Sequence, residues 1–452
     1  MSFSKDFYWG AASSSYQIEG AAFRYGKGLS IWDTFCQING KIKNGESGEV
    51  ACDHYHRFRE DVALMKELGL KAYRFSISWP RILPDGTGKV NEEGIKFYSD
   101  LVDELLKAGI EPFITLFHWD LPKAVYDRGG WRNREIADWF AEYTKVVVDA
   151  LSDKVRFWIT LNEALCHILL GHNLGVHAPG ETAPNREIFR MLHHINLAHG
   201  KAVHVIRKFS KTPAVVGFAP NPGPGIPLTD RIEDIEAAKA YTFSGTVKGL
   251  FSNGWWMDPI LTGEYPKDGI EAMAKDFPSD MIKEGDMELI GQKLDFLGVN
   301  LYQGAFITHD ESGSFKICPQ KPGYPINALK WQITPQILYY MPKFLYEKYQ
   351  LPILITENGI YLPDWISLDG KVHDANRIDF MHRYLKELKK ASDEGIDIMG
   401  YFAWSIMDNF EWSEGYNERF GLIYIDYETQ KRIPKDSYYW YKDVISLNGD
   451  NL

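Results

Sequence analysis

The feature that most constrains the fold of this chain is a series of eight short apolar segments, spaced widely enough for a helix to lie between neighbours. They are Phe7–Ala11, Ala72–Ser78, Pro112–Leu116, Val155–Asn162, Val215–Ala219, Phe296–Tyr302, Ile353–Glu357 and Ile398–Trp404. Uninterrupted apolar segments are typical of strands buried on both faces of a parallel sheet. Because helix-like stretches separate them, the pattern predicts an α/β fold, a (β/α)8 TIM barrel with elaborated βα loops.

The intervals between these segments carry helical patterns and no linker. Phe58–Gly69 and Phe97–Gly109 each end at a glycine, the residue that most often terminates a helix. The segment Pro220–Pro227 is rich in proline and glycine, and we expect an irregular βα loop there rather than a domain boundary. Residues 1–452 are therefore predicted to form one domain. No GxGxxG motif follows the first apolar segment and no Walker loop occurs, which argues against nucleotide-binding folds.

Composition limits the classes of partner. The chain has 50 basic and 61 acidic residues and a formal net charge of −11, which argues against nucleic acid or an anionic membrane as a partner. No apolar stretch reaches the roughly 18 residues that a membrane helix needs. Met1–Phe7 lacks the apolar core of a signal peptide, and four cysteines without CxxC spacing favour reduced thiols. We expect a cytoplasmic protein. Assembly into a homo-oligomer stays open, because the sequence does not indicate how many subunits assemble.

Two of the apolar segments lead into a glutamate. Glu163 follows the fourth segment, and Glu357 ends the seventh. A charged residue at the end of a buried strand is costly unless it is paired, hydrogen-bonded or used in chemistry. The two positions are far apart in the sequence, so only the fold could bring them together. Two carboxylates that face one site are the minimal apparatus of glycoside hydrolysis.

Other polar and aromatic residues lie at or just after the ends of the predicted strands, where the active site of such a barrel is found. They are Gln17 and Glu19 after the first strand, Arg74 in the second, His118 and Trp119 after the third, Asn162 and Glu163 at the fourth, Asn300 and Tyr302 in the sixth, Glu357 in the seventh, and Trp404, Glu411 and Trp412 at the eighth. Each residue alone could be structural, but their joint occurrence favours an active site.

Two histidine clusters resemble metal ligands. One is the segment Asp53–His56, and the other is the pair His193 and His194. Neither cluster has HExxH spacing or a cysteine partner, so the sequence predicts no metal and no cofactor.

Six longer motifs follow one another along the whole chain. They are Phe7–Gly20, Tyr73–Arg81, His118–Pro122, Thr160–Glu163, Ile355–Gly359 and Trp404–Trp412. With these motifs the chain closely resembles glycoside hydrolase family 1, the β-glucosidase family of retaining enzymes. The resemblance runs from end to end, and the order and length of the motifs make it specific.

The resemblance implies a role for each strand-end residue. Glu163 matches the acid/base, and Glu357 matches the nucleophile that forms a covalent glycosyl-enzyme intermediate. Arg74 and Tyr302 would keep Glu357 ionised and oriented, because an opposite charge and a donated hydrogen bond favour the charged form. The other matched residues are Asn300, counted with the catalytic group, and the substrate-binding residues Gln17, His118, Trp119, Asn162, Trp331, Trp404, Glu411, Trp412 and Phe420.

Among the substrate-binding residues, Asn162 would bond the sugar 2-hydroxyl, and Trp331 falls on the aglycone side. Retention would require the two carboxyl groups to lie only about 5–5.5 Å apart. One departure from the family pattern touches the site. The family usually has proline after the acid/base, whereas here Ala164 follows Glu163. Because proline biases the preceding residue toward extended geometry, its loss could loosen Glu163 slightly without removing the carboxylate.

The function that the resemblance implies is a retaining exo-β-glucosidase. It would hydrolyse terminal β-D-glucosyl residues of small β-glucosides or cello-oligosaccharides, as in cellulose degradation, and tolerate β-galactosides or β-fucosides. The nearest rival is a 6-phospho-β-glycosidase of the same family, whose members typically carry a small hydroxyl residue, Lys and Tyr where this chain has Glu411, Glu418 and Phe420. The sequence also leaves open a non-catalytic sugar-binding barrel and a transglycosidase.

Overall fold

A central sheet of eight parallel strands organises the structure, a computed structural model that describes residues 3–311 and 314–452. The strands are β1 (Tyr8–Ala12), β2 (Ala72–Ser76), β3 (Glu111–Phe117), β4 (Phe157–Asn162), β5 (Val215–Ala219), β7 (Leu297–Asn300), β10 (Ile353–Asn358) and β11 (Ile398–Trp404). Their order in the sheet is β5-β4-β3-β2-β1-β11-β10-β7. Each strand lies within or overlaps one of the eight apolar segments, so all eight strand predictions are confirmed.

The two end strands of this sheet, β5 and β7, meet and close it. The Asp295 N–H donates to the Val216 carbonyl at 2.8 Å, and the Asn300 N–H donates to the Pro220 carbonyl at 2.9 Å. The sheet is therefore a barrel, and the prediction of a (β/α)8 TIM barrel is confirmed. In such a barrel the C-terminal strand ends gather at one face, which is where the polar residues of the sequence motifs fall.

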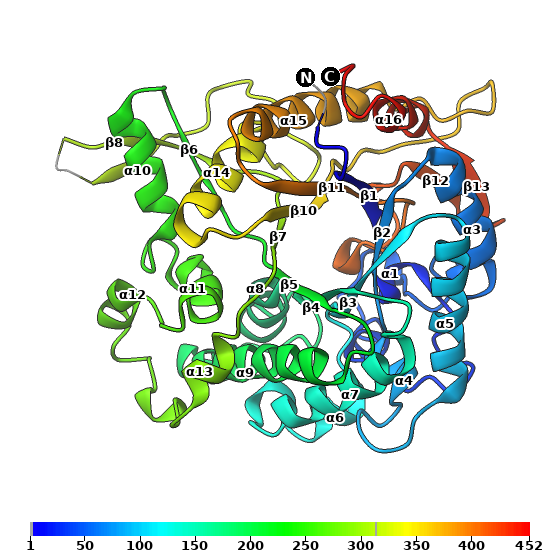
Figure 1. Cartoon of the computed structure of the whole chain (residues 1–452), viewed down its shortest axis with the longest axis horizontal. Coiled ribbons are helices and arrows are strands. Elements are labelled where there is room, and N and C mark those ends of the chain that lie inside the picture. Colours follow the sequence, from blue (N-terminus) through cyan, green and yellow to red (C-terminus); the bar gives the residue numbers. More distant parts are fainter. Residues whose placement is uncertain (1–2, 312–313) are drawn as a thin grey trace.

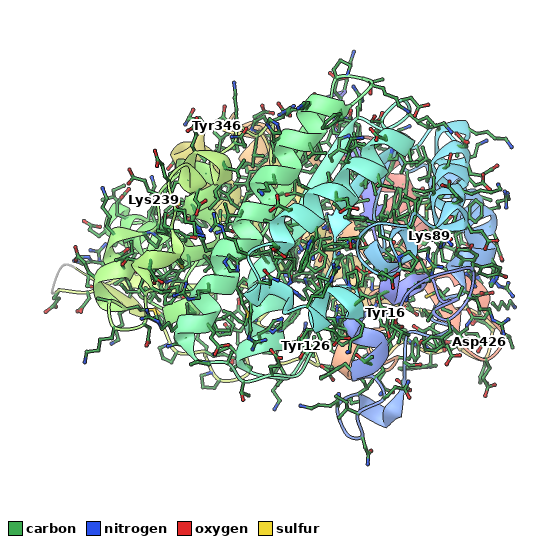
Figure 2. The ribbon with its side chains drawn as sticks, turned by 90° about the horizontal axis from the view of Figure 1, so that it is seen from below. Tyr16, Lys89, Tyr126, Lys239, Tyr346 and Asp426 are labelled. Carbon is green, nitrogen blue, oxygen red and sulfur yellow. The ribbon has the colours of Figure 1, made fainter. Side chains whose placement is uncertain are left out.

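Long helices surround the barrel. The principal ones are α3 (His54–Leu68), α5 (Glu92–Lys107), α7 (Ile136–Leu151), α9 (Asn185–Phe209), α14 (Ile337–Tyr349), α15 (Ala375–Asp393) and α16 (Asp436–Ser446). Figure 1 shows α3 and α5 on one side of the strands, α7 and α9 below them, and α14, α15 and α16 above. Figure 2 shows α7 and α9 side by side across the lower face, where they pack against each other. Gly69 and Gly109 follow α3 and α5 with positive φ, as their positions in the sequence predict.

Shorter elements occupy the connections. They are α1 (Ser15–Ile18), α2 (Ile31–Phe35), α4 (Trp79–Ile82), α6 (Lys123–Asp127), α8 (Ala164–Ile168), α10 (Ile232–Phe243), α11 (Gly254–Thr262), α12 (Lys267–Ala272), α13 (Asp286–Ile290), the short helices η1 (Lys43–Gly45), η2 (Gly130–Arg132), η3 (Leu169–Asn173), η4 (Gly249–Phe251), η5 (Ser279–Met281) and η6 (Trp412–Glu414), and the hairpin β12 (Ile423–Asp426) and β13 (Lys431–Pro434).

The segment Pro220–Pro227 differs from the prediction at its end. Its last three residues form β6 (Gly225–Pro227), which pairs in parallel with β8 (Ala305–His309). β8 also pairs with β9 (Phe315–Ile317), so a small three-stranded sheet stands apart from the barrel. The prediction of an irregular loop is wrong for these three residues. A strand this short carries no periodicity, and its pairing partner lies far along the chain.

Large aromatic side chains fill the inside of the barrel. Phe113 and Phe157 stack with ring centres 4.1 Å apart, and Phe402 packs against Phe113 at 5.1 Å. These rings are buried, and they belong to the same cluster as Trp404 at the C-terminal end of β11. The barrel interior is therefore a packed core. Among the described residues, which exclude Met1 and Ser2 of the amino-terminal segment, no helix is long and apolar enough to cross a bilayer.

Candidate active site

A cavity of about 480 Å³ opens at the C-terminal ends of the barrel strands. Its predicted lining residues are His118, Trp119, Asn162, Glu163, Asn300, Tyr302, Trp331, Glu357, Trp404, Glu411, Trp412 and Phe420. The two remaining predicted residues, Arg74 and Gln17, are buried directly behind this lining and bond to it. The structure thus brings together the catalytic and substrate-binding residues that the family resemblance implies.

Glu163 sits at a strained turn between β4 and α8. Its φ of +43° and ψ of +56° are left-handed, and its N–H donates to the Ala219 carbonyl of β5 at 2.8 Å. Trp119 and Trp412, with φ of +76° and +51°, are also left-handed. Such a conformation costs a non-glycine residue on the order of 1–3 kcal/mol, and residues of this kind cluster at functional sites.

Glu357 is held by two donors. Arg74 Nη1 lies 2.6 Å from Glu357 Oε1, and the Tyr302 hydroxyl donates to Glu357 Oε2 at 2.8 Å. The carboxyl group is buried, with 3% of the residue exposed. Burial raises the pKa of Glu357, whereas the Arg74 charge and the Tyr302 hydrogen bond act against that rise. The negative charge of Glu357 is therefore compensated within the site.

Glu163 has a different set of partners. Asn300 Nδ2 donates to Glu163 Oε1 at 2.7 Å, and no lysine or arginine of the described chain forms an ion pair with it. Burial and the negative charge of Glu357 raise the pKa of Glu163 to about 8. Because only Glu357 has an adjacent cation, Glu163 is the member of the pair that keeps its proton to higher pH.

An amide network connects the strands around the two glutamates. Asn162 Oδ1 accepts from Arg74 Nη2 at 2.6 Å and from Asn300 Nδ2 at 3.0 Å. Its Nδ2 therefore faces His118 Nε2, at 3.1 Å. Burial, together with the Arg74 charge, lowers the pKa of His118 well below its usual value, so the ring is neutral. With Nε2 accepting, the proton is on Nδ1, which has no partner within the described protein and can donate to a ligand.

The wall formed by the segments after β1 and β11 carries a third carboxyl group, that of Glu411. Gln17 Nε2 donates to Asn409 Oδ1 at 3.0 Å, to the Phe410 carbonyl at 3.0 Å and to Glu411 Oε2 at 3.3 Å. Burial and the charges of Glu357 and Glu163 raise the pKa of Glu411 to about 8. The buried Glu163 and Glu357 and the half-buried Glu411 thus share one cavity with the buried Arg74.

Aromatic rings form the remaining walls. Trp119 lies 4.7 Å from Trp412, and the His118 ring stacks on Trp404 at 5.8 Å. On the side that follows β7, Trp331 packs against Tyr302 at 5.4 Å. Flat rings around hydrogen-bonding groups suit a sugar, whose C–H faces are apolar and whose hydroxyl groups are polar.

Comparison with known proteins agrees with this geometry. The sequence profile of glycosyl hydrolase family 1 matches residues 1–450. This chain belongs to glycosyl hydrolase family 1.

Several family 1 relatives match it over nearly their full length. β-Glucosidase A of Thermotoga maritima is 46% identical over 451 residues, which cover 99% of this chain and 98% of the relative. A solved structure of β-glucosidase from the same organism in complex with glucoimidazole superposes with a TM-score of 0.90 at 44% identity, covering 99% of each chain. An aryl-phospho-β-D-glucosidase of Bacillus subtilis is 40% identical over 481 residues, covering 100% of this chain and 98% of the relative.

Sequence reasoning missed some residues of the family 1 cavity. Cys166, Asn221 and Lys248 also line it. Asn221 Nδ2 donates to Cys166 Sγ at 3.0 Å, and the Cys166 thiol acts on Glu163 as a hydrogen-bond donor. Cys166 lies three positions after Glu163 at the start of α8, and this helical spacing could have indicated it. No local pattern marks Lys248, because it reaches the cavity from the segment after α10.

Other polar residues that the sequence analysis singled out have structural partners. Glu19 bonds Arg81 at 2.9 Å and Tyr98 at 2.6 Å, outside the cavity lining. The histidines of the two clusters each bond a different partner. His54 pairs with Asp61, His56 with Asp53, His193 with Asp286, and His194 with the Trp131 carbonyl. Within residues 3–311 and 314–452, no group of three or more suitable side chains could hold a metal.

Proposed function

We propose that this family 1 protein is a retaining exo-β-glucosidase whose whole chain acts as one catalytic domain. The observation that carries the proposal is that two buried glutamates in one cavity have different bonding partners. Glu357 bonds Arg74 and Tyr302, whereas Glu163 accepts from the Asn300 amide and the Cys166 thiol and forms no ion pair within the described residues. A retaining enzyme needs one ionised nucleophile and one protonated acid, and this arrangement supports both states. The β-glucosidase relatives support glucose as the sugar.

In the first step, the Glu357 carboxylate attacks the anomeric carbon of the glucoside. The new C–O bond forms as the glycosidic C–O bond breaks, and Glu163 transfers its proton to the departing aglycone oxygen. Arg74 and Tyr302 orient the attacking carboxylate. The raised pKa of Glu163, about 8, means that this residue carries the required proton at neutral pH.

In the second step, water releases the glucose. Formation of the ester removes the negative charge of Glu357, so one cause of the raised pKa of Glu163 disappears and Glu163 becomes able to accept a proton. Glu163 then takes a proton from the water as its oxygen attacks the anomeric carbon. The bond to Glu357 breaks, and two inversions leave the original configuration.

The remaining residues would bind the sugar. We assign the hydroxyl contacts to Gln17, His118, Asn162, Glu411 and Trp412, and the apolar floor to Trp404. Trp119, Asn300 and Phe420 complete the enclosure, and Trp331 would face the aglycone. These positions line the cavity or, for Gln17, lie behind it, which supports the assignment without identifying individual hydroxyl groups.

A 6-phospho-β-glycosidase activity is less well supported. With a pKa of about 8, Glu411 is largely protonated at neutral pH in the free protein, so it repels a phosphate only weakly. The stronger argument is that the described residues of this wall include no free cation. Lys43 is ion-paired with both Glu414 and Glu418, and Arg419 Nη1 lies 2.7 Å from Asp408.

The experiment that tests the proposal is a panel of chromogenic p-nitrophenyl glycosides. The β-glucoside is expected to exceed its 6-phosphate by on the order of a hundredfold in kcat/KM, because a phosphate would be bound without a partner. β-Galactoside and β-fucoside are expected to react more slowly than the glucoside. Equal or better turnover of the 6-phosphate would replace β-glucosidase with the phosphoglycosidase assignment. The cytoplasmic location expected from the sequence stays a prediction that cell fractionation can test.

A further inference from the structure

Lys248 places a positive charge on a cavity that is otherwise rich in carboxyl groups. It is the one lysine or arginine among the described lining residues, and its ammonium group forms no ion pair with any carboxylate in the described part of the chain. The situation of Lys43 is the opposite, since its charge is taken up by Glu414 and Glu418. Lys248 is exposed, so its charge is available to a ligand.

Several contacts hold the position of Lys248. Its backbone N–H donates to Ser252 Oγ at 2.9 Å, at the start of η4. Its ammonium group lies 5.3 Å from the centre of the Tyr241 ring, within the range of a cation–π contact. It also lies close over Gly223, where an added Cβ would come within 2.8 Å of Nζ. The glycine therefore leaves room for the ammonium group against the loop that follows β5.

The order of strands in the barrel indicates which end of a substrate Lys248 would meet. β5 is next to β4, which leads into Glu163, and it lies opposite β1 in the ring of eight. Gln17 and Glu411 follow β1 and β11 on the far side. If Glu163 protonates the glycosidic oxygen, as the proposed function states, the leaving group lies on its side of the cavity. Lys248 is then on the aglycone side.

We propose that Lys248 gives this enzyme selectivity for β-glucosides whose aglycone carries an anionic group such as a carboxylate. This inference rests on the proposed function. The ionised form of Glu357, and those of Glu163 and Glu411 at higher pH, repel a negatively charged aglycone. The unpaired ammonium of Lys248 offsets that repulsion where the aglycone leaves the enclosed part of the cavity.

The test compares two substrates of nearly equal size, 4-carboxyphenyl β-glucoside and the methyl ester of the same compound. The measured quantity is the ratio of their kcat/KM values, carboxylate over ester. Comparing this ratio between enzyme variants cancels the intrinsic difference in leaving-group reactivity. In Lys248→Met the ratio is expected to fall about two- to fivefold, the range of an exposed ion pair. In about 1 M NaCl, where the Debye length is about 3 Å, the difference between wild type and variant should shrink.

Three further variants complete the test. Lys248→Arg keeps the charge and should keep the ratio, and Lys248→Gln serves as a second neutral variant if Lys248→Met does not fold. Lys239→Met is the matched charge control. Lys239 lies on α10 at the molecular surface and pairs with Glu347 at 2.6 Å. In Figure 2 it lies far from Tyr16 of α1, the helix that follows β1.

An unchanged ratio in the neutral Lys248 variants would overturn the inference, as would an equal fall in Lys239→Met. In either case hydrolysis of the methyl ester by the wild type would leave the proposed function standing. If the wild type hydrolyses neither the ester nor p-nitrophenyl β-glucoside, the proposed function is wrong and the inference falls with it.

Discussion

At the scale of single residues, the two glutamates differ through their partners rather than through their burial. Both are almost completely enclosed, with 7% of Glu163 and 3% of Glu357 exposed. The difference is that Arg74 lies against one and only amide and thiol groups lie against the other. In a buried site a single cation decides which carboxyl group ionises first. The proposed roles of nucleophile and acid follow from this asymmetry.

Glu357→Ala is expected to abolish hydrolysis, with a loss on the order of 10⁴-fold or more in kcat. The variant leaves a space in front of Arg74, and a small anion such as azide or formate should occupy it and restore part of the turnover. Because the anion attacks directly and nothing displaces it afterwards, the product should be the α-configured glucosyl azide, identified by NMR. Turnover near that of the wild type without added anion would remove Glu357 from the nucleophile role.

The pH profile of kcat/KM should be bell-shaped. Activity requires Glu357 ionised and Glu163 protonated, so the rate rises as Glu357 loses its proton and falls as pH passes the Glu163 pKa of about 8. Glu411 also titrates at about 8, so Glu411→Gln is the necessary comparison. The alkaline limb should persist in Glu411→Gln, at slightly lower pH because one nearby negative charge is gone. Its disappearance would assign the limb to Glu411.

Glu163→Ala should distinguish substrates by their leaving groups. A good leaving group such as dinitrophenolate needs little protonation, so pre-steady-state glycosylation should slow far less for it than for a phenyl or alkyl glucoside. Equal slowing of both classes would contradict an acid role for Glu163.

At the scale of elements, the strands were predictable because each is a continuous apolar segment between polar surroundings. The residues at which the strands end were less predictable. The second segment runs to Ser78, whereas β2 ends at Ser76, and the sixth runs to Tyr302, whereas β7 ends at Asn300. In both cases the chain leaves the sheet while the side chains remain buried or half-buried. Burial without backbone pairing gives the same apolar pattern as a strand.

The junction of β4 and α8 leads to a prediction about Ala164. Ala164 is the first residue of α8, a position where proline is favoured because the N–H has no helical partner. We expect Ala164→Pro to retain activity and to gain about 0.4–1 kcal/mol in the free energy of unfolding. Ala164→Gly is the control and should lose stability, since glycine is a poor helix former.

The structure also shows what this variant would probe. Glu163 has a left-handed backbone conformation rather than an extended one. A proline at position 164 would bias Glu163, the residue before it, toward extended geometry. If the hydrogen bond to the Ala219 carbonyl holds Glu163, proline will be accepted. A large loss of both stability and activity would mean that Ala164 is what allows this backbone geometry. Denaturant unfolding and p-nitrophenyl β-glucoside kinetics measure the two effects.

At the scale of the whole molecule, a buried ion-pair network joins the C-terminal segment to the barrel. Lys435 Nζ lies 2.7 Å from Asp408 and 2.6 Å from Asp364, and it is completely buried. Burial alone would raise the pKa of Asp408, but Lys435 and Arg419 outweigh it and hold the pKa below the usual value. The contribution of Asp408 to stability is therefore present above the pKa of an unfolded aspartate and is lost as pH falls through the lower folded value.

Asp408→Ala is expected to destabilise the fold by about 3–5 kcal/mol, because it removes one partner of a buried pair. Thermal unfolding at neutral pH should show a drop of several degrees in Tm. The control is Asp379→Ala, which breaks an exposed pair with Arg383 whose side chains are 60% and 59% accessible, and its effect should be close to zero. Equal shifts in the two variants would show that the buried network does not stabilise the fold.

The sequence by itself determined the (β/α)8 barrel, the eight strands and the set of residues at their C-terminal ends. These features depend on local hydrophobic patterning and on the rule that parallel strands end at one face, both of which can be read along the chain. The resemblance to family 1 can likewise be read along the chain, because continuous sequence motifs carry it.

Tertiary structure alone decided which groups meet and in what state of charge. The raised pKa of Glu411, the pairing of β6 with β8 and the arrival of Lys248 at the cavity all depend on residues that are distant in the chain. Burial and charge interactions depend on three-dimensional distance, which no local pattern encodes. For that reason the residues of the site and the ionised state of Glu357 could be predicted from the sequence and its resemblance, whereas the raised pKa of Glu411 and the charge on the aglycone side could not.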